Sequence, residues 1–196
     1  MPSILHAVRH VSGRPRFFSR VVALLLAGTL LPLSQAASQE LKVGDPAPDF
    51  TVTTVTASGP DAKPFRLSDH RGETVILAFF PQAGTSGCTT QMEGYRDRYA
   101  AVFKGGDKVT LVGVSTDSEK ELVEWAREKR FPFRFAADGS KAVAKAYGAS
   151  SMLWHKRHLY VIDSAGRIAY IARPFRQMAD EAYTELGQAI AASRPR

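Results

Sequence analysis

A continuous apolar run of residues that favour β-structure, Thr-Val-Ile-Leu-Ala-Phe-Phe, occupies Thr74–Phe80. Successive side chains of a strand point to opposite faces of a sheet, so a run without alternating polar residues predicts a strand that is covered on both faces. Lys108–Ser115 has the same character and predicts a second buried strand. Strands of this kind occur in sheets that carry helices on both sides. The two runs therefore predict an α/β fold.

Helix-like and strand-like patterns alternate through the rest of the chain. Between the two buried strands, apolar residues recur at helical spacing from Cys88 to Val102. Ser118–Arg130 is amphipathic, and Ser118 with Glu121 has the spacing of a capping box. The other predicted elements are strands at Phe50–Val55, Phe133–Ala136, His158–Asp163 and Arg167–Ala172 and helices at Ser140–Tyr147 and Met178–Ala192. The order β-α-β-α-β-β-α is typical of a thioredoxin-like sheet with an inserted segment, although periodicity alone also fits other α/β folds.

The first 36 residues have the order of features found in a secretory signal peptide. The segment before residue 21 contains four arginines and no acidic residue. An apolar run follows at Val21–Leu33, and small residues come after it at Ser34 and Ala36. The run is short for a membrane-spanning helix, which needs ~20 apolar residues. We expect cleavage after Ala36 and export to the periplasm, with an uncleaved N-terminal anchor as the alternative. Residues 37–196 are then expected to form one domain that buries its own core.

The charge of the chain does not favour binding to nucleic acid. The formal net charge is +7, but four of the 26 basic residues and none of the 19 acidic residues lie in the predicted signal peptide, which leaves +3 for residues 37–196. That part has no run of basic residues interleaved with aromatic ones. A net charge of +3 on residues 37–196 is too small to indicate a nucleic-acid partner. For the cleaved domain we also expect no integral membrane partner.

The chain has a single cysteine, Cys88, which cannot form an intrachain disulfide. A free cysteine is either a small buried apolar residue or a reactive thiol. Cys88 stands at the start of a predicted helix, where free backbone N–H groups and the helix dipole stabilise a thiolate. Thr85 can turn its hydroxyl toward the same space, and Pro81 gives the preceding loop a rigid wall. The surroundings favour the reactive thiol.

These residues resemble the Pro-x-x-x-Thr-x-x-Cys motif of peroxiredoxins, which follows a buried strand in that family as it does here. Three further segments are similar to the family: Val43–Phe50 to its N-terminal signature, Gly87–Asp97 to the active-site helix of the bacterioferritin comigratory protein subgroup, and Arg157–Gly166 to the segment that carries the active-site arginine. The resemblance extends over residues 41–190. It implies a thioredoxin-like fold, with a central mixed β-sheet flanked by helices.

The resemblance also implies a function, which is the thiol-dependent reduction of hydrogen peroxide and organic hydroperoxides in antioxidant defence and redox homeostasis. It implies Cys88 as the peroxidatic nucleophile, Thr85 as the hydrogen-bond partner of the peroxide and Pro81 as a shield. Arg157 is implied as the cation beside the reacting atoms, and Gln91 as the residue that orients it. A fixed guanidinium suits this role, because negative charge moves from sulfur to the departing oxygen during the reaction.

One position departs from the subgroup, many members of which have a resolving cysteine five residues after the first. Glu93 stands there in this chain. Oxidised Cys88 must therefore react with an external thiol, small or thioredoxin-like, or pair with a second molecule, and we expect a monomer or a homodimer. No cofactor is expected. His155 and His158 have no third ligand nearby in the sequence, so no metal site is expected either.

Two other classes of function compete with this interpretation. An exported thiol–disulfide oxidoreductase or copper-delivery protein of the same fold needs a second cysteine at position 91 or 92, where Gln91 and Met92 stand. A non-enzymatic redox, binding or chaperone domain would keep the fold and lose turnover. Peroxide consumption with and without small thiols distinguishes such a domain from an enzyme.

Overall fold

The structure is a computed structural model that describes residues 40–194. The predicted signal peptide, residues 1–36, lies outside the described residues. The strands are β1 (Thr51–Val52), β2 (Thr54–Thr56), β3 (Gly59–Pro60), β4 (Phe65–Arg66), β5 (Thr74–Phe79), β6 (Val109–Ser115), β7 (Arg134–Ala137), β8 (Leu159–Ile162) and β9 (Ile168–Ala172). The helices are α1 (Ser86–Asp97), α2 (Tyr99–Val102), α3 (Glu119–Lys129), α4 (Ala142–Ala146) and α5 (Asp180–Ser193), with short 3-10 helices η1 (Leu67–His70) and η2 (Lys104–Gly106).

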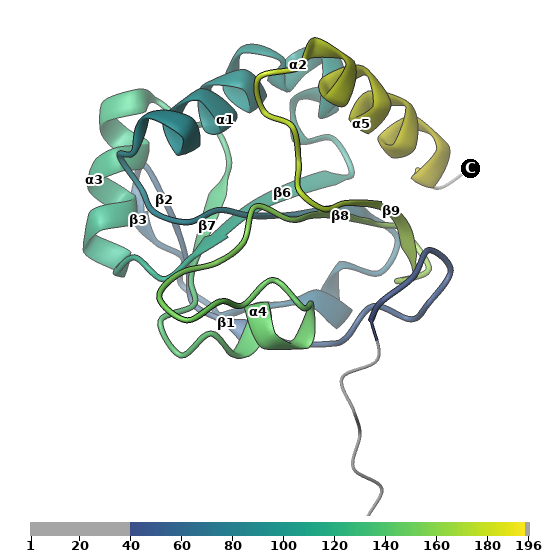
Figure 1. Ribbon diagram of the computed structural model, residues 1–196, viewed down its shortest axis with the longest axis horizontal. Helices are drawn as coiled ribbons and strands as arrows, with labels where there is room; N and C mark the ends of the chain where they lie inside the picture. Colours follow the sequence, from purple (N-terminus) through teal and green to yellow (C-terminus); the bar gives the residue numbers. More distant parts are fainter. Residues whose placement is uncertain (1–39, 195–196) are drawn as a thin grey trace, which may run out of the picture. The chain divides into compact units, whose positions relative to one another are not determined.

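A mixed sheet of seven strands, in the order β3-β2-β7-β6-β5-β8-β9, divides the domain into two layers (Figure 1). Helices α1, α3 and α5 pack on one face, where they share a hydrophobic core with the sheet. Helix α4 and η1 cover the other face and form a second core. The predicted α/β fold, with a mixed sheet between helices, is confirmed.

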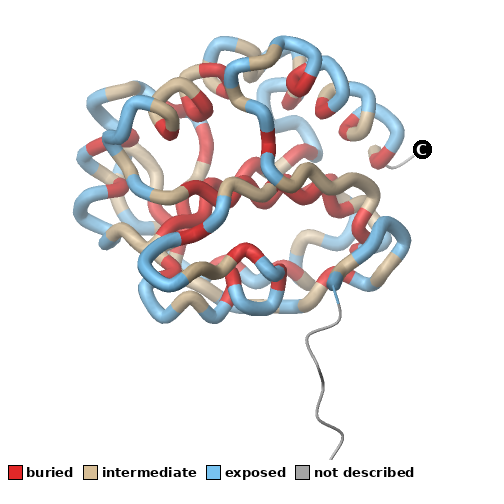
Figure 2. Tube along the Cα trace, in the orientation of Figure 1, coloured by how far each residue is buried: buried red, intermediate tan, exposed pale blue. Residues whose placement is uncertain are grey.

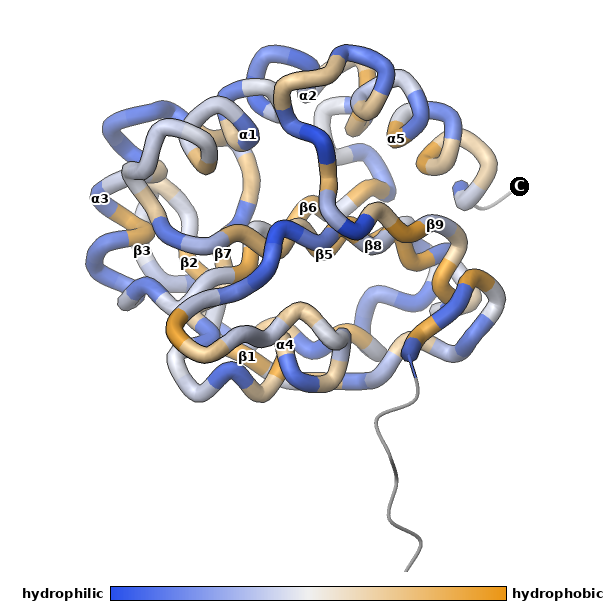
Figure 3. Tube along the Cα trace, viewed as in Figure 1, coloured by the Kyte–Doolittle hydropathy of each residue, from blue (hydrophilic) through white to orange (hydrophobic). Residues whose placement is uncertain are grey.

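Strand β5 lies in the interior of this sheet, and all of its residues are buried. It pairs in parallel with β6, from Thr74 opposite Val109 to Phe79 opposite Val114. On its other side it pairs antiparallel with β8. Figure 2 shows buried positions along the sheet and on the helix sides that face it, and Figure 3 shows hydrophilic positions on outer loops and helix faces. The continuous apolar run is thus explained by cover on both faces.

The segment Phe50–Val55, predicted as one strand, is divided between two sheets. β1 pairs with β4 in a small separate sheet, whereas β2 pairs with β7 and β3 in the main one. The segment changes its pairing partners at Thr53, between β1 and β2. Phe50 and Val52 pack against the core on the α4 side of the main sheet, and Val55 is buried in the core on the other side.

One predicted helix start is confirmed, and one predicted helix is shorter than expected. The Ser118 side chain accepts a hydrogen bond from the Glu121 backbone and the Glu121 carboxylate accepts one from the Ser118 backbone, so the predicted capping box is confirmed. The helix predicted to run from Cys88 to Val102 is instead interrupted at Arg98, which lies over the Tyr183 ring of α5. None of the helices within residues 40–194 is long and apolar enough to cross a membrane.

Gly113 in β6 permits the close packing of two aromatic rings beneath the helices. A Cβ atom at this position would lie 2.7 Å from the Phe135 ring and 3.3 Å from the Phe80 ring. We predict that Gly113→Ala lowers the free energy of unfolding by about 1–3 kcal/mol, the usual cost of overpacking a core. Urea unfolding measures this change. Gly139→Ala is the matched control, because a Cβ there meets no atom within 4 Å, and an equal loss in both variants would contradict the explanation.

Candidate active site

Cys88 lies near the start of α1, just beyond the buried strand β5. The chain leaves β5 at Phe79, passes through a loop that begins at Pro81, and enters α1 with Thr85 as the N-cap residue. Cys88 is therefore in the first turn of the helix, where backbone N–H groups lack helical partners and the helix dipole is positive. Such an end stabilises a thiolate relative to a thiol.

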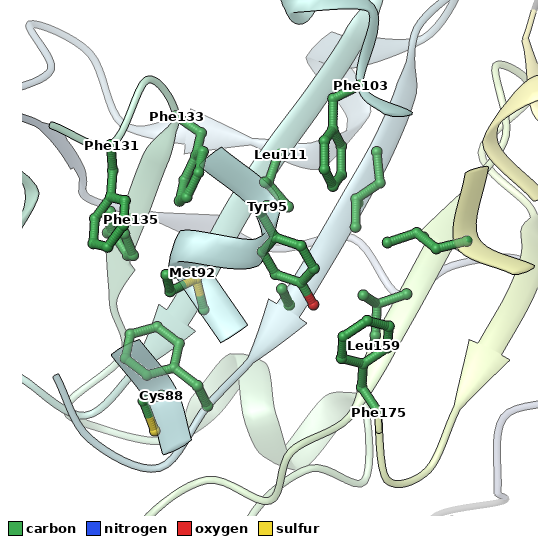
Figure 4. Close-up of a cluster of buried hydrophobic side chains, with 14 of the residues drawn as sticks. Cys88, Met92, Tyr95, Phe103, Leu111, Phe131, Phe133, Phe135, Leu159 and Phe175 are labelled. Carbon is green, nitrogen blue, oxygen red and sulfur yellow. The ribbon is translucent and has the colours of Figure 1, made fainter. Parts of the chain in front are cut away.

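The Cys88 side chain points into the molecule. Only 1% of the residue is exposed. It lies on the same side of α1 as Met92 and Tyr95 and belongs to the core beneath that helix (Figure 4). The sulfur is therefore recessed among apolar groups, where electrostatic interactions are stronger than they are in water.

Arg157 meets Cys88 because of the way the strands pair. β8 is antiparallel to β5, so the residues that precede β8 lie beside the loop that follows β5. The backbone of Phe79 donates a hydrogen bond to the His158 carbonyl (2.9 Å), and that of Phe175 donates one to the Arg157 carbonyl (2.8 Å). From this anchored position the Nη2 atom of Arg157 lies 3.4 Å from the Sγ atom of Cys88. A permanent cation thus contacts the only thiol.

Gln91 contacts the other terminal nitrogen of the Arg157 guanidinium. It is one helical turn after Cys88 and is completely buried. Its Oε1 atom accepts a hydrogen bond from Nη1 of Arg157. Among the described residues, no carboxylate forms an ion pair with Arg157. Since Gln91 is neutral, the positive charge of Arg157 remains available to the sulfur.

Thr85 and Pro81 lie at the two ends of the loop. The Thr85 hydroxyl donates to the Gln82 carbonyl (3.0 Å), so in this structure it braces the loop and must rotate before it can meet a peroxide. The Thr85 carbonyl accepts the Thr89 N–H at 2.8 Å, as expected of an N-cap residue. Pro81 is partly buried where the loop begins. The roles given to these two residues stay predictions.

Two residues that sequence patterns alone did not identify also shape the site. A Cβ atom on Gly87 would lie 3.4 Å from Nη2 of Arg157, so glycine leaves room for the guanidinium beside the helix start. Asp117, just after β6, accepts a hydrogen bond from the Ala83 backbone (2.8 Å) and fixes the loop. The carboxyl ends of parallel β5 and β6 meet at one edge of the sheet, which is the signal that points to Asp117.

The two histidines near Arg157 in the sequence, His155 and His158, have different neighbours. His155 is buried, with Nδ1 3.2 Å from the Val114 carbonyl and Nε2 3.4 Å from the Asp138 carboxylate. Burial lowers the pKa of His155 below its usual value, which favours the neutral imidazole. His158 packs against the ring of Tyr160. Within residues 40–194 no group of three His, Cys, Asp or Glu side chains is arranged to hold a metal ion.

A buried strand that leads to a cysteine at a helix start, with an arginine on its sulfur, defines a thioredoxin-fold thiol enzyme. The sequence profile of the AhpC/TSA family matches residues 43–171. The chain is 32% identical over 143 residues to the chloroplastic peroxiredoxin Q of Triticum aestivum, a match that spans 71% of this chain and 65% of the relative. It is 28% identical over 148 residues to peroxiredoxin Bcp of Escherichia coli strain K12, spanning 69% of this chain and 88% of the relative.

Solved structures agree with the sequence comparison. The structure of peroxidoxin BcpB from Mycobacterium tuberculosis superimposes with a TM-score of 0.67 at 25% identity, covering 80% of this chain and all of that one. A cysteine-to-serine mutant of PrxQ from Xylella fastidiosa gives a TM-score of 0.68 at 19% identity, with coverage of 79% and 99%. The chain therefore belongs to the AhpC/TSA family of peroxiredoxins, which are thiol-dependent peroxidases, and the thioredoxin-like fold is confirmed.

The contact between Arg157 and Cys88 leads to a quantitative expectation. We predict that Arg157→Ala slows the oxidation of Cys88 by peroxide by about a hundredfold, the size of losing one preorganised transition-state donor. Arg157→Lys should recover only part of the rate, because an ammonium group cannot reproduce the planar fork that contacts both Cys88 and Gln91. Stopped-flow single-turnover oxidation measures these rates. An unchanged rate in the alanine variant would make Arg157 an ordinary surface cation.

Proposed function

We propose that this peroxiredoxin works with one cysteine, reducing hydrogen peroxide and organic hydroperoxides at Cys88 and regenerating it with an external thiol. The observation that carries the proposal is the 3.4 Å contact of the Arg157 guanidinium with Sγ of Cys88, at a helix start and beneath an apolar cover. A thiolate there is stabilised by both the helix end and the cation.

In the first step the Cys88 thiolate attacks one oxygen of the peroxide. A sulfur–oxygen bond forms, the oxygen–oxygen bond breaks, and the leaving oxygen takes up a proton to give an alcohol or water. Cys88 is oxidised to a sulfenic acid and the peroxide is reduced. Charge passes from sulfur to the leaving oxygen, so Arg157, held by Gln91, stabilises the transition state more than the ground state. Thr85 is assigned a hydrogen bond to the peroxide, and Pro81 shields the thiolate.

The second half of the cycle needs two external thiols. The first attacks the sulfenic acid, releases water and forms a mixed disulfide with Cys88; the second releases Cys88 and leaves a disulfide of the external thiol. The sequence contains no other cysteine, which supports this route. A disulfide between two Cys88 residues needs the sulfurs ~2 Å apart, and the burial of Cys88 disfavours it. The cycle requires no bound cofactor, and we assign the thiol a small or thioredoxin-like source.

The location follows from the N-terminal pattern of the sequence. Residues 1–36 have the features of a cleavable signal peptide, so we assign the mature enzyme to the periplasm, where it takes part in antioxidant defence and redox homeostasis. A monomer satisfies the proposed cycle, since every group assigned a role comes from one chain. N-terminal sequencing of the protein secreted to the periplasm tests the cleavage site after Ala36.

Replacement of the single cysteine tests the proposed function. We predict that Cys88→Ser abolishes thiol-dependent peroxide consumption while the far-UV circular dichroism spectrum is retained, because the small isosteric change removes the nucleophile and little packing volume. Peroxide loss is followed with dithiothreitol as reductant. Turnover by the serine variant at the native rate would refute the assignment of Cys88.

The absence of a second cysteine from the sequence leads to a prediction about overoxidation. No tethered thiol captures the sulfenic acid, so turnover should rise with the concentration of the added thiol. Excess peroxide without thiol should convert Cys88 to sulfinic and sulfonic acid. Steady-state rates and intact mass measure the two effects. Rapid, nearly complete conversion to a disulfide-linked dimer on non-reducing electrophoresis would contradict the external-thiol cycle.

A further inference from the structure

We propose that Tyr95 is a positioning residue of the peroxidase site, whose hydroxyl acts through Gln91 on the guanidinium of Arg157. The inference rests on the proposed function in one respect, the assignment of Cys88 as the nucleophile. It adds a residue that lies two hydrogen bonds away from the cation and three contacts away from the sulfur.

A continuous chain of polar contacts leads from Tyr95 to the thiol. The Nε2 atom of Gln91 donates a hydrogen bond to the Tyr95 hydroxyl oxygen (3.0 Å). On the other end of the same amide, Oε1 accepts from Nη1 of Arg157. The second terminal nitrogen of Arg157 then contacts Sγ of Cys88 at 3.4 Å. Tyr95, Gln91 and Cys88 all project from α1, whereas Arg157 precedes β8.

The Tyr95 hydroxyl is a polar group inside an aromatic cluster. The residue is completely buried, and Figure 4 shows its ring among the side chains around Phe103, Leu159 and Phe175. Gln91 is the only side-chain hydrogen-bond partner of this hydroxyl in the described part of the chain. Burial raises the pKa of Tyr95 well above its usual value, so the group remains a neutral hydroxyl at any pH where the enzyme works.

The hydrogen bond between Gln91 and Tyr95 matters because both the oxygen and the NH₂ group of a buried amide need hydrogen-bond partners. Arginine has only donors, so the end of Gln91 that faces Arg157 must be the oxygen. The NH₂ end then points away from the cation into the apolar core, where it needs an acceptor. Tyr95 supplies that acceptor. Without it, a conformation that turns the amide away from Arg157 becomes competitive, because the present one leaves a buried donor unpaired.

The consequence for the site is the orientation of the guanidinium plane. Nη1 and Nη2 belong to one rigid fork, so a partner that fixes Nη1 also fixes the direction in which Nη2 approaches Cys88. The Tyr95 ring is itself held by edge-to-face contacts with Phe103 and Tyr183. The packed ring of Tyr95 thus holds one end of the series of contacts that orients the Arg157 guanidinium.

The test replaces only the hydroxyl. We expect Tyr95→Phe to lower the second-order rate constant for Cys88 oxidation by hydrogen peroxide by about tenfold, less than the loss expected for removing Arg157 itself. Tyr147→Phe is the matched control: Tyr147 is also fully buried and its hydroxyl donates to the Pro48 carbonyl (2.8 Å), but it lies in the core on the other side of the sheet. Its oxidation rate should stay within about twofold of the native rate.

Two readouts separate positioning from a general loss of stability. First, the pH at which alkylation of Cys88 by iodoacetamide is half-maximal should rise in Tyr95→Phe, because a misaligned cation stabilises the thiolate less. Second, adding Tyr95→Phe to an Arg157→Ala background should change the oxidation rate by less than about twofold, since the group through which Tyr95 acts is gone. A structural defect would instead slow both backgrounds equally.

A native oxidation rate in folded Tyr95→Phe, or an equal effect in both backgrounds, would overturn the inference. Should Tyr95→Phe fail to fold, Gln91→Leu tests the same chain of contacts and should give a similar loss of rate and shift of the alkylation profile; unchanged values would also overturn it. These outcomes are distinct from failure of the proposed function, which requires that Cys88→Ser retain peroxidase turnover.

Discussion

The pairing of β5 with β6 on one side and β8 on the other is the constraint on which the site depends. Parallel pairing brings the loop after β6, with Asp117, to the loop that leads toward Cys88. Antiparallel pairing brings the residues before β8, with Arg157, to the same end. Three segments distant in sequence therefore meet at one edge of the sheet. The register of these pairs, with Thr74 opposite Val109 and Phe79 opposite Val114, fixes this arrangement.

The positive charge of Arg157 is not neutralised by its hydrogen-bond partner, because that partner is the amide of Gln91. A carboxylate at position 91 would form an ion pair with the guanidinium and reduce the field that reaches the sulfur. The Gln91 amide fixes the geometry without neutralising the charge. A partly buried cation is costly unless a negative group faces it. In the proposed cycle the departing oxygen is that group, so the positive charge stabilises the transition state more than the ground state.

Local patterns predict the features that depend on neighbouring residues. The apolar run of β5, the position of Cys88 at a helix start and the Ser118 capping box each arise within a few residues, and each is found in the structure. The division of Phe50–Val55 was not predictable in this way, since its two parts pair with strands that lie elsewhere in the sequence, β1 with β4 and β2 with β7. The local pattern also does not predict the break at Arg98, whose guanidinium lies over the Tyr183 ring of a distant helix.

The geometry of the site was only partly accessible from sequence. The resemblance to peroxiredoxins named Arg157 and Gln91, but their contact joins residues 66 positions apart, and no local pattern predicts it. The rotamer of Thr85 depends on the Gln82 carbonyl within the folded loop. Helical periodicity counts Tyr95 as one more residue of the buried face and does not show what its hydroxyl contacts.

The most direct measurement is the intact mass of the mature protein after one equivalent of hydrogen peroxide, with dimedone present to trap sulfenic acid and no thiol added. If Cys88 is a one-cysteine peroxidatic centre, nearly all of the protein should carry a single dimedone adduct, mapped to Cys88 by fragmentation. Protein of unmodified mass, with the peroxide still present after the time that a peroxiredoxin needs for one turnover, would contradict this account.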